Sequence, residues 1–259
     1  EIMPSLVGSE MCIRDSLSRL AILYPSNATG KTMSEIFHQR AAALGARIIR
    51  KSSYPSDATD FGRQIRALGG MTDQEVERVR EANERRGKKS TQIPNIPFEG
   101  LFIPDVAAQA ALIIPGLGFY NIRGIHLLGI SGWNSNEIIA LAKKEVEGAY
   151  FVGGYSQLSP TARRARFARD FQRAFSELPS KISALSYDSM RFLLAGIRKS
   201  GNNRTALRKL LSKNQGFDGV TGNFRIDSTG AARRNLPIMT INNGTVSYTH
   251  LTLPTILLV

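Results

Sequence analysis

The sequence has little cysteine, few histidines and no long hydrophobic run. Its single cysteine, Cys12, cannot form an intramolecular disulfide, which excludes a disulfide-stapled mini-domain. No apolar run reaches the roughly 18 residues needed to span a bilayer, so an integral membrane protein is not expected. His38 and His126 lie far apart, with no Cys or carboxylate at ligand spacing, so no metal site is predicted.

Catalytic motifs are also scarce. Between the two ends of the chain there is no Gly-x-Ser-x-Gly turn, no metalloprotease helix and no cysteine nucleophile. We therefore expect a protein that is not an enzyme, and we predict no cofactor.

The two ends of the 259-residue chain differ in sequence character from the rest of the chain. Residues 1–16 (EIMPSLVGSEMCIRDS) and 247–259 (SYTHLTLPTILLV) resemble translated sequencing adaptors, and we interpret both as foreign ends. The alternative is a short leader at one end and a genuine terminal strand at the other. The remaining 17–246 is long enough for one large domain or two small lobes with their own cores.

Positive charge is in large excess. The formal net charge is +13, and leaving out residues 1–16, which hold Glu1, Glu10 and Asp15 against Arg14, raises it to +15. One basic cluster, Arg78–Lys89, alternates with glutamates at helical spacing, as on a solvated, ion-paired helix face. No zinc-ligand spacing or aromatic RNA-binding motif accompanies it or the second cluster, Arg163–Arg173. We expect no nucleic-acid partner, and an anionic envelope surface fits the charge at least as well.

Strand and helix signals alternate through the first part of the chain. Expected strands lie at Leu20–Tyr24, from Ala46, at Leu101–Ile103, Ile125–Ile130 and Tyr150–Val152. Expected helices are one from about Met33 to a stop at Gly45, Asp60–Leu68, Ala107–Phe119, and one through Ile138 and Leu141. Residues 71–97 are polar and charged, and we read them as an insert outside the core. This alternation predicts the α/β class, with a mostly parallel sheet covered on both faces.

From Thr161 the pattern becomes helical. Apolar stripes recur along the helices and are predicted to be ordinary buried faces rather than a binding motif. Strands joined by turns at Ser228–Gly230 and at Asn242–Gly244 follow. The stripes are Phe167, Phe171 and Phe175; Tyr187, Met190, Leu194 and Ile197; and Leu207, Leu210 and Leu211.

The segment from Pro25 to Thr32 (PSNATGKT) nearly matches a phosphate-binding P-loop, and Asp105 after an apolar strand imitates its magnesium ligand. Pro25 stands where that motif needs glycine, and proline has no N–H to donate to a phosphate. The plainer reading is that Ser26 or Asn27 caps a helix whose first turn contains Gly30. A P-loop-like nucleotide hydrolase remains a lesser alternative.

Several segments in a fixed order resemble the type 1 periplasmic binding proteins of the leucine/isoleucine/valine-binding kind. The resemblance covers nearly all of 17–246 apart from the charged insert. It runs through LAILYPSNATGKTMSEIFHQRAAALGARIIRKSSYPSDATDFGRQIRAL, FEGLFIPDVAAQAALIIPGLGFYNI, LLGISGWNSNEI, KKEVEGAYFVGGYS, SYDSMRFLLAGIRKSG and FDGVTGNFRIDSTGAARRNLPIMTINNGTV.

This resemblance implies a two-lobe binder that closes on a ligand held between the lobes. The second lobe would span 17–153, including the insert at 71–97. Residues 154–222 would supply helices of an incomplete first lobe, and 223–246 would form C-terminal strands. Those helices would lack the sheet they normally cover, which would leave an apolar face without its partner.

The resemblance also implies site residues at the carboxyl ends of the strands: Thr29, Asp105 with Val106, and Ser131 with Trp133. Ser131 stands where branched-chain amino-acid binders hold the ligand ammonium with an acid. Asp105 either replaces that acid or caps a helix start. Trp133 either stacks on a ligand or fills the crevice by packing.

Two functions follow from the resemblance. The first is a non-catalytic periplasmic receptor of an ABC-type transporter, binding an amino-acid-like small molecule and docking on a membrane permease. The second is a penicillin-binding protein activator, an envelope lipoprotein that binds a peptidoglycan synthase. Both place the protein in the periplasm or cell envelope, although a shared fold does not decide between them.

Overall fold

The computed structural model describes residues 17–71, 74, 78, 81, 96–153, 155, 162–201, 203–213, 216–234 and 238–248. The chain divides into two compact units. The large unit contains the described residues of 17–152 and 238–248, and the small unit contains the described residues from 153 to 234. The chain therefore leaves the large unit after Val152 and returns to it at Ile238.

A seven-stranded sheet forms the centre of the large unit, in the order β10-β9-β5-β4-β3-β1-β2. The five strands from β5 to β2 run parallel, whereas β9 and β10 join antiparallel at the β5 edge. The strands are β1 (Arg19–Pro25), β2 (Arg47–Tyr54), β3 (Gly100–Ile103), β4 (His126–Gly129), β5 (Tyr150–Val152), β9 (Ile238–Asn242) and β10 (Thr245–Tyr248). The α/β prediction with a parallel-dominated sheet is confirmed.

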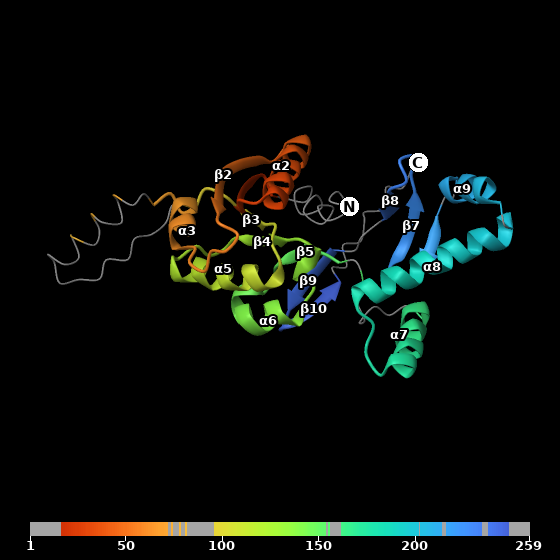
Figure 1. Ribbon diagram of the computed structural model, residues 1–259. Coiled ribbons are helices and arrows are strands. Elements are labelled where there is room, and N and C mark those ends of the chain that lie inside the picture. The colour runs from red at the N-terminus through yellow and green to blue at the C-terminus, as the bar shows by residue number, and fades with distance from the viewer. Residues whose placement is uncertain are drawn as a thin grey trace, which may run out of the picture. The chain divides into compact units, whose positions relative to one another are not determined.

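Helices cover both faces of this sheet (Figure 1). On one face α2 (Ala28–Ala43) packs on β1 and β3, and the rings of Phe37 and Phe102 stack 4.0 Å apart. The opposite face carries the larger apolar cluster, built with α3 (Gly62–Leu68), α5 (Ala107–Phe119), α6 (Asn136–Ala142) and the 3-10 turn η3 (Lys143–Val146). Strands with apolar residues on both sides need both layers, as the sequence indicated.

The small unit combines helices with a three-stranded antiparallel sheet in the order β6-β7-β8. Its elements are α7 (Ala162–Phe175), α8 (Lys181–Ser200), α9 (Arg204–Ser212), β6 (Phe217–Gly219), β7 (Gly222–Ile226) and β8 (Ala232–Arg234). A buried carboxylate joins helix to sheet: Asp188 accepts hydrogen bonds from Val220 N at 2.7 Å, Thr221 N at 2.8 Å and Thr221 Oγ1 at 2.6 Å.

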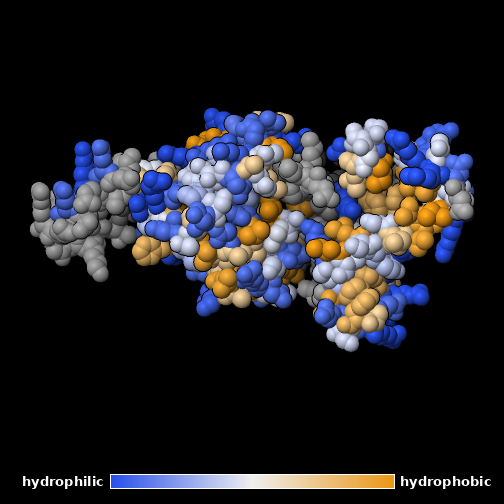
Figure 2. All heavy atoms as spheres, in the orientation of Figure 1, coloured by the Kyte–Doolittle hydropathy of each residue, from blue (hydrophilic) through white to orange (hydrophobic). Residues whose placement is uncertain are grey.

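The predicted buried face of α8 is wrong. Tyr187, Met190, Leu194 and Ile197 are all exposed, Met190 by 55%. The helix instead buries the side that carries Ala184, Asp188, Phe192 and Gly196. Figure 2 shows apolar surface over α8 in the small unit. Amphipathic spacing identified a stripe that favours burial, but the residues that the structure describes leave it exposed.

Some expectations meet the structure only in part. The charged insert lies mostly outside the described residues, as do residues 1–16 and most of 247–259; Ser247 and Tyr248 are the last two residues of β10. The strands expected at 223–246 are divided, since β7 and β8 belong to the small unit and β9 and β10 to the large one. Within the described ranges no helix combines the length and apolar composition that a membrane crossing requires.

Candidate functional site

The candidate site is the edge of the large sheet where parallel strands β1, β2, β3 and β4 have their carboxyl ends. Because β3 lies between β1 and β4 in the sheet, the residues that follow these strands share one rim. Ligands of open α/β sheets bind at this edge, because loops and helix N-termini there leave polar groups uncommitted. We call this region, with residues 24–29, 54–58, 104–109 and 130–135, the carboxyl edge.

Hydrogen bonds connect the four strand ends to one another. Ser26 N donates to the carbonyl of Tyr54 at 2.7 Å, which ties the end of β1 to the end of β2. Tyr54 Oη donates to Asp105 Oδ2 at 2.7 Å, and Trp133 Nε1 donates to the carbonyl of Asp105 at 3.1 Å. The rim is therefore held together by specific contacts between distant parts of the chain.

The first predicted site residue, Thr29, is exposed in the first turn of α2. That helix begins at Asn27, whose Oδ1 accepts a hydrogen bond from Gly30 N at 2.8 Å, so the capping interpretation is confirmed. A Cβ at Gly30 would lie 2.1 Å from the carbonyl oxygen of Pro25, so glycine is required there for packing. The Gly30 N–H is occupied by Asn27, which removes a donor that a phosphate loop needs.

Asp105 and Val106 lie between β3 and α5. Val106 is 54% exposed and occupies the N-cap position, and its N–H donates to Asp105 Oδ1 at 2.7 Å. The carboxylate of Asp105 is half-buried, and no ion pair to it forms within the part of the chain that the structure describes. Helix α5, like α2, has no acidic residue in its first turn, so its positive end is uncompensated except by Asp105.

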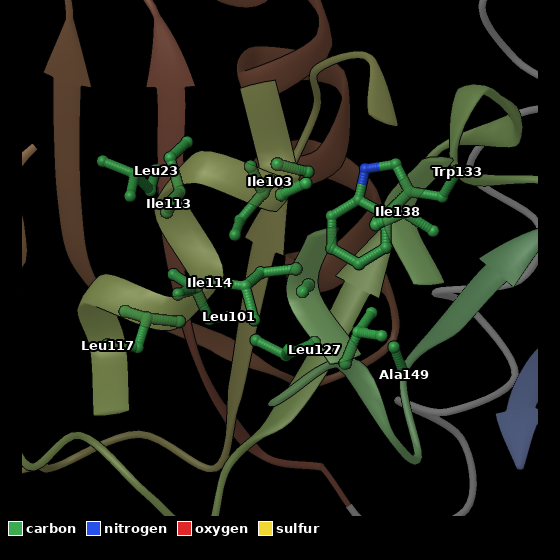
Figure 3. Close-up of a cluster of buried hydrophobic side chains, with 14 of the residues drawn as sticks. Leu23, Leu101, Ile103, Ile113, Ile114, Leu117, Leu127, Trp133, Ile138 and Ala149 are labelled. Atoms are coloured by element: carbon green, nitrogen blue, oxygen red, sulfur yellow. The ribbon is translucent and has the colours of Figure 1, made fainter. Parts of the chain in front are cut away.

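Ser131 and Trp133 form the short 3-10 turn η2 (Ser131–Trp133) after β4. Ser131 is half-buried, whereas Trp133 is 0% exposed and packs in the apolar cluster beside Ile138 (Figure 3). A Cβ at Gly129 would lie 2.2 Å from the Trp133 ring, so the indole occupies the space that this glycine leaves. Trp133 thus offers no surface to a ligand in this arrangement, which favours the packing alternative.

Tyr54 is the residue at this edge that sequence reasoning missed. It is fully buried at the end of β2, and its ring meets Phe61 edge to face at 5.0 Å. Burial raises the pKa of its phenol above the ordinary value, and the hydrogen bond to Asp105 and the charge of that carboxylate add to the effect. The sequence predicted only the start of its strand, from Ala46, and no local pattern indicated its hydrogen-bond partner 51 positions away.

A separate cavity of about 440 Å³ lies at the opposite end of β4. It is lined by residues of α5 and of the 122–127 segment, most of them apolar, and by the charged residues Arg123, Lys144, Glu145 and Glu147. None of the predicted site residues lines it. Glu147 there is engaged structurally, since its carboxylate accepts hydrogen bonds from Asn243 N and Gly244 N in the β9–β10 turn.

These features define an α/β unit whose parallel-dominated sheet has polar groups at one edge, and the described residues hold no group of three or more metal-ligating side chains. The family model described as periplasmic binding protein matches residues 13–245. The chain belongs to the periplasmic binding protein family.

Solved structures share this fold at low sequence identity. A putative branched-chain amino acid ABC transporter protein from Rhodospirillum rubrum is 19% identical with a TM-score of 0.77, covering 95% of this chain and 65% of its own. A leucine-binding protein from Thermotoga maritima is 20% identical (TM-score 0.64; 90% and 59%). A solute-binding protein from R. palustris in complex with benzoate is 15% identical (TM-score 0.68; 96% and 62%).

This chain therefore spans less than two thirds of the length of these structures. No curated protein matches it. The family resemblance read from the sequence is confirmed by the family match and by the shared fold.

Proposed function

We propose that this chain is the ligand-binding part of a periplasmic receptor of an ABC-type transporter. Its ligand is an amino acid or a related small polar molecule, and it delivers that ligand to a membrane permease without chemical change. The family match supports the class, and structures of similar fold were solved with leucine, isoleucine and benzoate. The periplasm is the compartment that this role requires.

The observation that carries the proposal is the construction of the carboxyl edge. Adjacent parallel strands β1, β3 and β4 end there, and Thr29, Asp105, Val106 and Ser131 follow them. We propose these four residues as one wall of the ligand site, with Trp133 supporting the wall from within the core. A small zwitterion needs both donors and acceptors, and this rim supplies hydroxyls, helix N-termini and carboxylates, among them that of Asp105.

Calorimetry on the complete protein, including any sequence beyond these 259 residues, tests the proposal. Leucine, isoleucine, valine and benzoate are titrated in turn. Micromolar or tighter binding, equivalent to about −8 kcal/mol, to one of them supports a receptor. Absence of binding to all four contradicts the proposed ligand class.

The small unit gives one reason to keep the activator as a second candidate. Between residues 153 and 237 the sequence holds 16 Lys and Arg against five Asp and Glu, which favours an anionic partner. A pull-down with a peptidoglycan synthase, run beside the calorimetry, separates the two functions. Capture of the synthase, together with no detectable binding of any of the four ligands, favours the activator function.

A further inference from the structure

We propose that the cavity at the amino ends of β4 and β5 is a second ligand site, separate from the carboxyl edge. Its ligand is a small amphipathic acid, a molecule with an apolar body and one carboxylate. The inference does not depend on the proposed receptor function, because none of the residues proposed for the carboxyl edge lines this cavity.

The apolar part of the cavity is formed by the packed core. Helix α5 supplies Ile114, Leu117 and Gly118 near its carboxyl end, and Ile122 and Leu127 follow in the segment that leads into β4. The four larger side chains are at most 6% exposed and belong to the large apolar cluster, in which Figure 3 shows three of them. A volume of about 440 Å³ lies within the roughly 300–1,000 Å³ of small-molecule pockets. An apolar body would therefore enter a largely preformed space.

Four charged side chains among the described residues line the same cavity: Arg123, Lys144, Glu145 and Glu147. Both carboxylate oxygens of Glu147 accept backbone N–H groups of the β9–β10 turn, at 2.9 and 2.6 Å. Arg123 Nη2 lies 3.5 Å from the carbonyl oxygen of Gly118, a contact that uses one of the five N–H donors of a guanidinium. Two cations and the carboxylate of Glu145 are thus left to meet a ligand.

This balance favours a carboxylate over an ammonium group in the ligand. The guanidinium of Arg123 can bind a carboxylate through two parallel N–H bonds, and Lys144 adds a second positive charge. The net charge of the chain, +13, also attracts anions to its surface. Glu145 opposes such a ligand, so removing its charge should change the affinity in the opposite direction from removing that of Arg123 or Lys144.

A cavity that merely accepts hydrocarbon makes a different prediction. Burial of apolar surface is not directional and does not depend on the charge of the head group. Two ligands with the same chain and opposite charges would then bind alike. Recognition by Arg123 and Lys144 separates them.

The test is calorimetry on the complete protein with octanoate and with octylammonium, which has the same chain length and the opposite charge. We expect one octanoate site with a Kd below about 1 mM, and at least about fivefold weaker binding of octylammonium. Arg123→Gln and Lys144→Gln should each weaken octanoate about twofold to fivefold, and Glu145→Gln should strengthen it about twofold. Lys143→Gln is the matched control, because this exposed lysine does not line the cavity.

Three further measurements locate the bound octanoate. Gly118→Leu adds a side chain at the cavity wall, where a Cβ meets nothing within 4 Å, and is expected to weaken octanoate at least about tenfold. Replacing Met190 and Leu194 by Gln removes apolar residues from the exposed stripe of α8 and should leave octanoate binding unchanged. Saturating leucine, directed to the carboxyl edge, should also leave it unchanged. Thermal melting shows that each variant is folded before its affinity is read.

Equal affinities for octanoate and octylammonium overturn the inference, as does the absence of octanoate binding or an unchanged octanoate affinity in both Gly118→Leu and Arg123→Gln. Loss of binding in the α8 variant would assign octanoate to that stripe, and competitive displacement by leucine would assign it to the carboxyl edge. Either result overturns the second site but leaves the receptor function standing. Octanoate bound at the cavity, with no binding of leucine, isoleucine, valine or benzoate, contradicts only the ligand class proposed for the receptor.

Discussion

The two units differ in how much apolar surface they expose and in their net charge. In the large unit both faces of the sheet are covered, and residues such as Leu20, Ile22, Phe102 and Trp133 have 2% exposure or less. The small unit exposes an apolar stripe on α8 and holds a net charge of +11, whereas the rest of the chain holds +2. The large unit therefore derives its stability mainly from a closed apolar core, and the small unit depends more on polar contacts such as those of Asp188.

We expect the substitution Asp188→Ala to produce the largest difference between the stabilities of the two units. The change leaves the N–H groups of Val220 and Thr221 without their acceptor in a buried place, at a cost of about 3 kcal/mol or more. Denaturation is followed by circular dichroism, which sees helices of both units, and by the fluorescence of the single tryptophan, Trp133, which lies in the large unit. Only the dichroism transition should shift.

Asp170→Ala is the control, since Asp170 is an exposed acid of α7 whose ion pairs lie on the surface. Equal shifts of both signals in Asp188→Ala would show that the two units unfold as one, and the comparison would fail.

Gly129→Ala tests the closed core of the large unit. The added Cβ meets the Trp133 ring, so we expect a loss of about 1–3 kcal/mol and a change in tryptophan emission. Gly118→Ala is the matched control, because a Cβ there meets nothing within 4 Å. An unchanged emission and midpoint in Gly129→Ala would show that the indole does not fill this space.

The exposed stripe of α8 should bind a hydrophobic dye. Replacing Met190 and Leu194 together by Gln is expected to lower dye fluorescence and light scattering of the chain several-fold, with little change in stability. Leu112→Gln on α5 is a control of similar exposure in the large unit and should have a much smaller effect. A monomeric, dye-negative and cooperatively melting chain without these substitutions would contradict the prediction.

The smallest effects concern two half-buried carboxylates, one in each unit. Hydrogen bonds from the Thr229 hydroxyl and from Arg233 lower the pKa of Asp227 in the small unit, and backbone N–H donation from Ser18, together with Arg19, lowers the pKa of Glu99 in the large unit. A carboxylate whose pKa is lowered in the folded state stabilises the folded protein. This stabilisation is complete above the ordinary pKa range of carboxyl groups and is lost as the pH falls through the pKa of the folded state.

Melting temperatures of Asp227→Asn and Glu99→Gln between pH 7 and pH 3 measure this. Each variant should be slightly less stable than the unmodified protein at pH 7, and the difference should shrink as the pH falls. A difference that grows in acid would contradict the assignment.

Local patterns in the sequence predicted most of the elements of the large unit. The helix Ala107–Phe119 and the strand Tyr150–Val152 were predicted with the bounds that the structure shows, because apolar runs and strand ends are local signals. Parallel pairing followed from the alternation of strands and helices.

The site was less accessible to sequence reasoning. The bond between Tyr54 and Asp105, and the choice between a stacking and a packed Trp133, depend on which loops meet in space. The prediction of the buried face of α8 was wrong for a related reason. Both faces of this helix contain apolar residues, and their spacing alone does not say which face packs against the rest of the unit.

The chain leaves the large unit after Val152 and returns to it at Ile238, and this path affects folding during synthesis. When a ribosome has completed β5, that strand is the bare edge of the parallel sheet, and its pairing strand β9 follows only after the whole small unit has been made. At roughly 5–20 residues per second this delay is on the order of 10 s. During that interval β5 is an unpaired edge strand, and unpaired edge strands are templates on which other chains can pair.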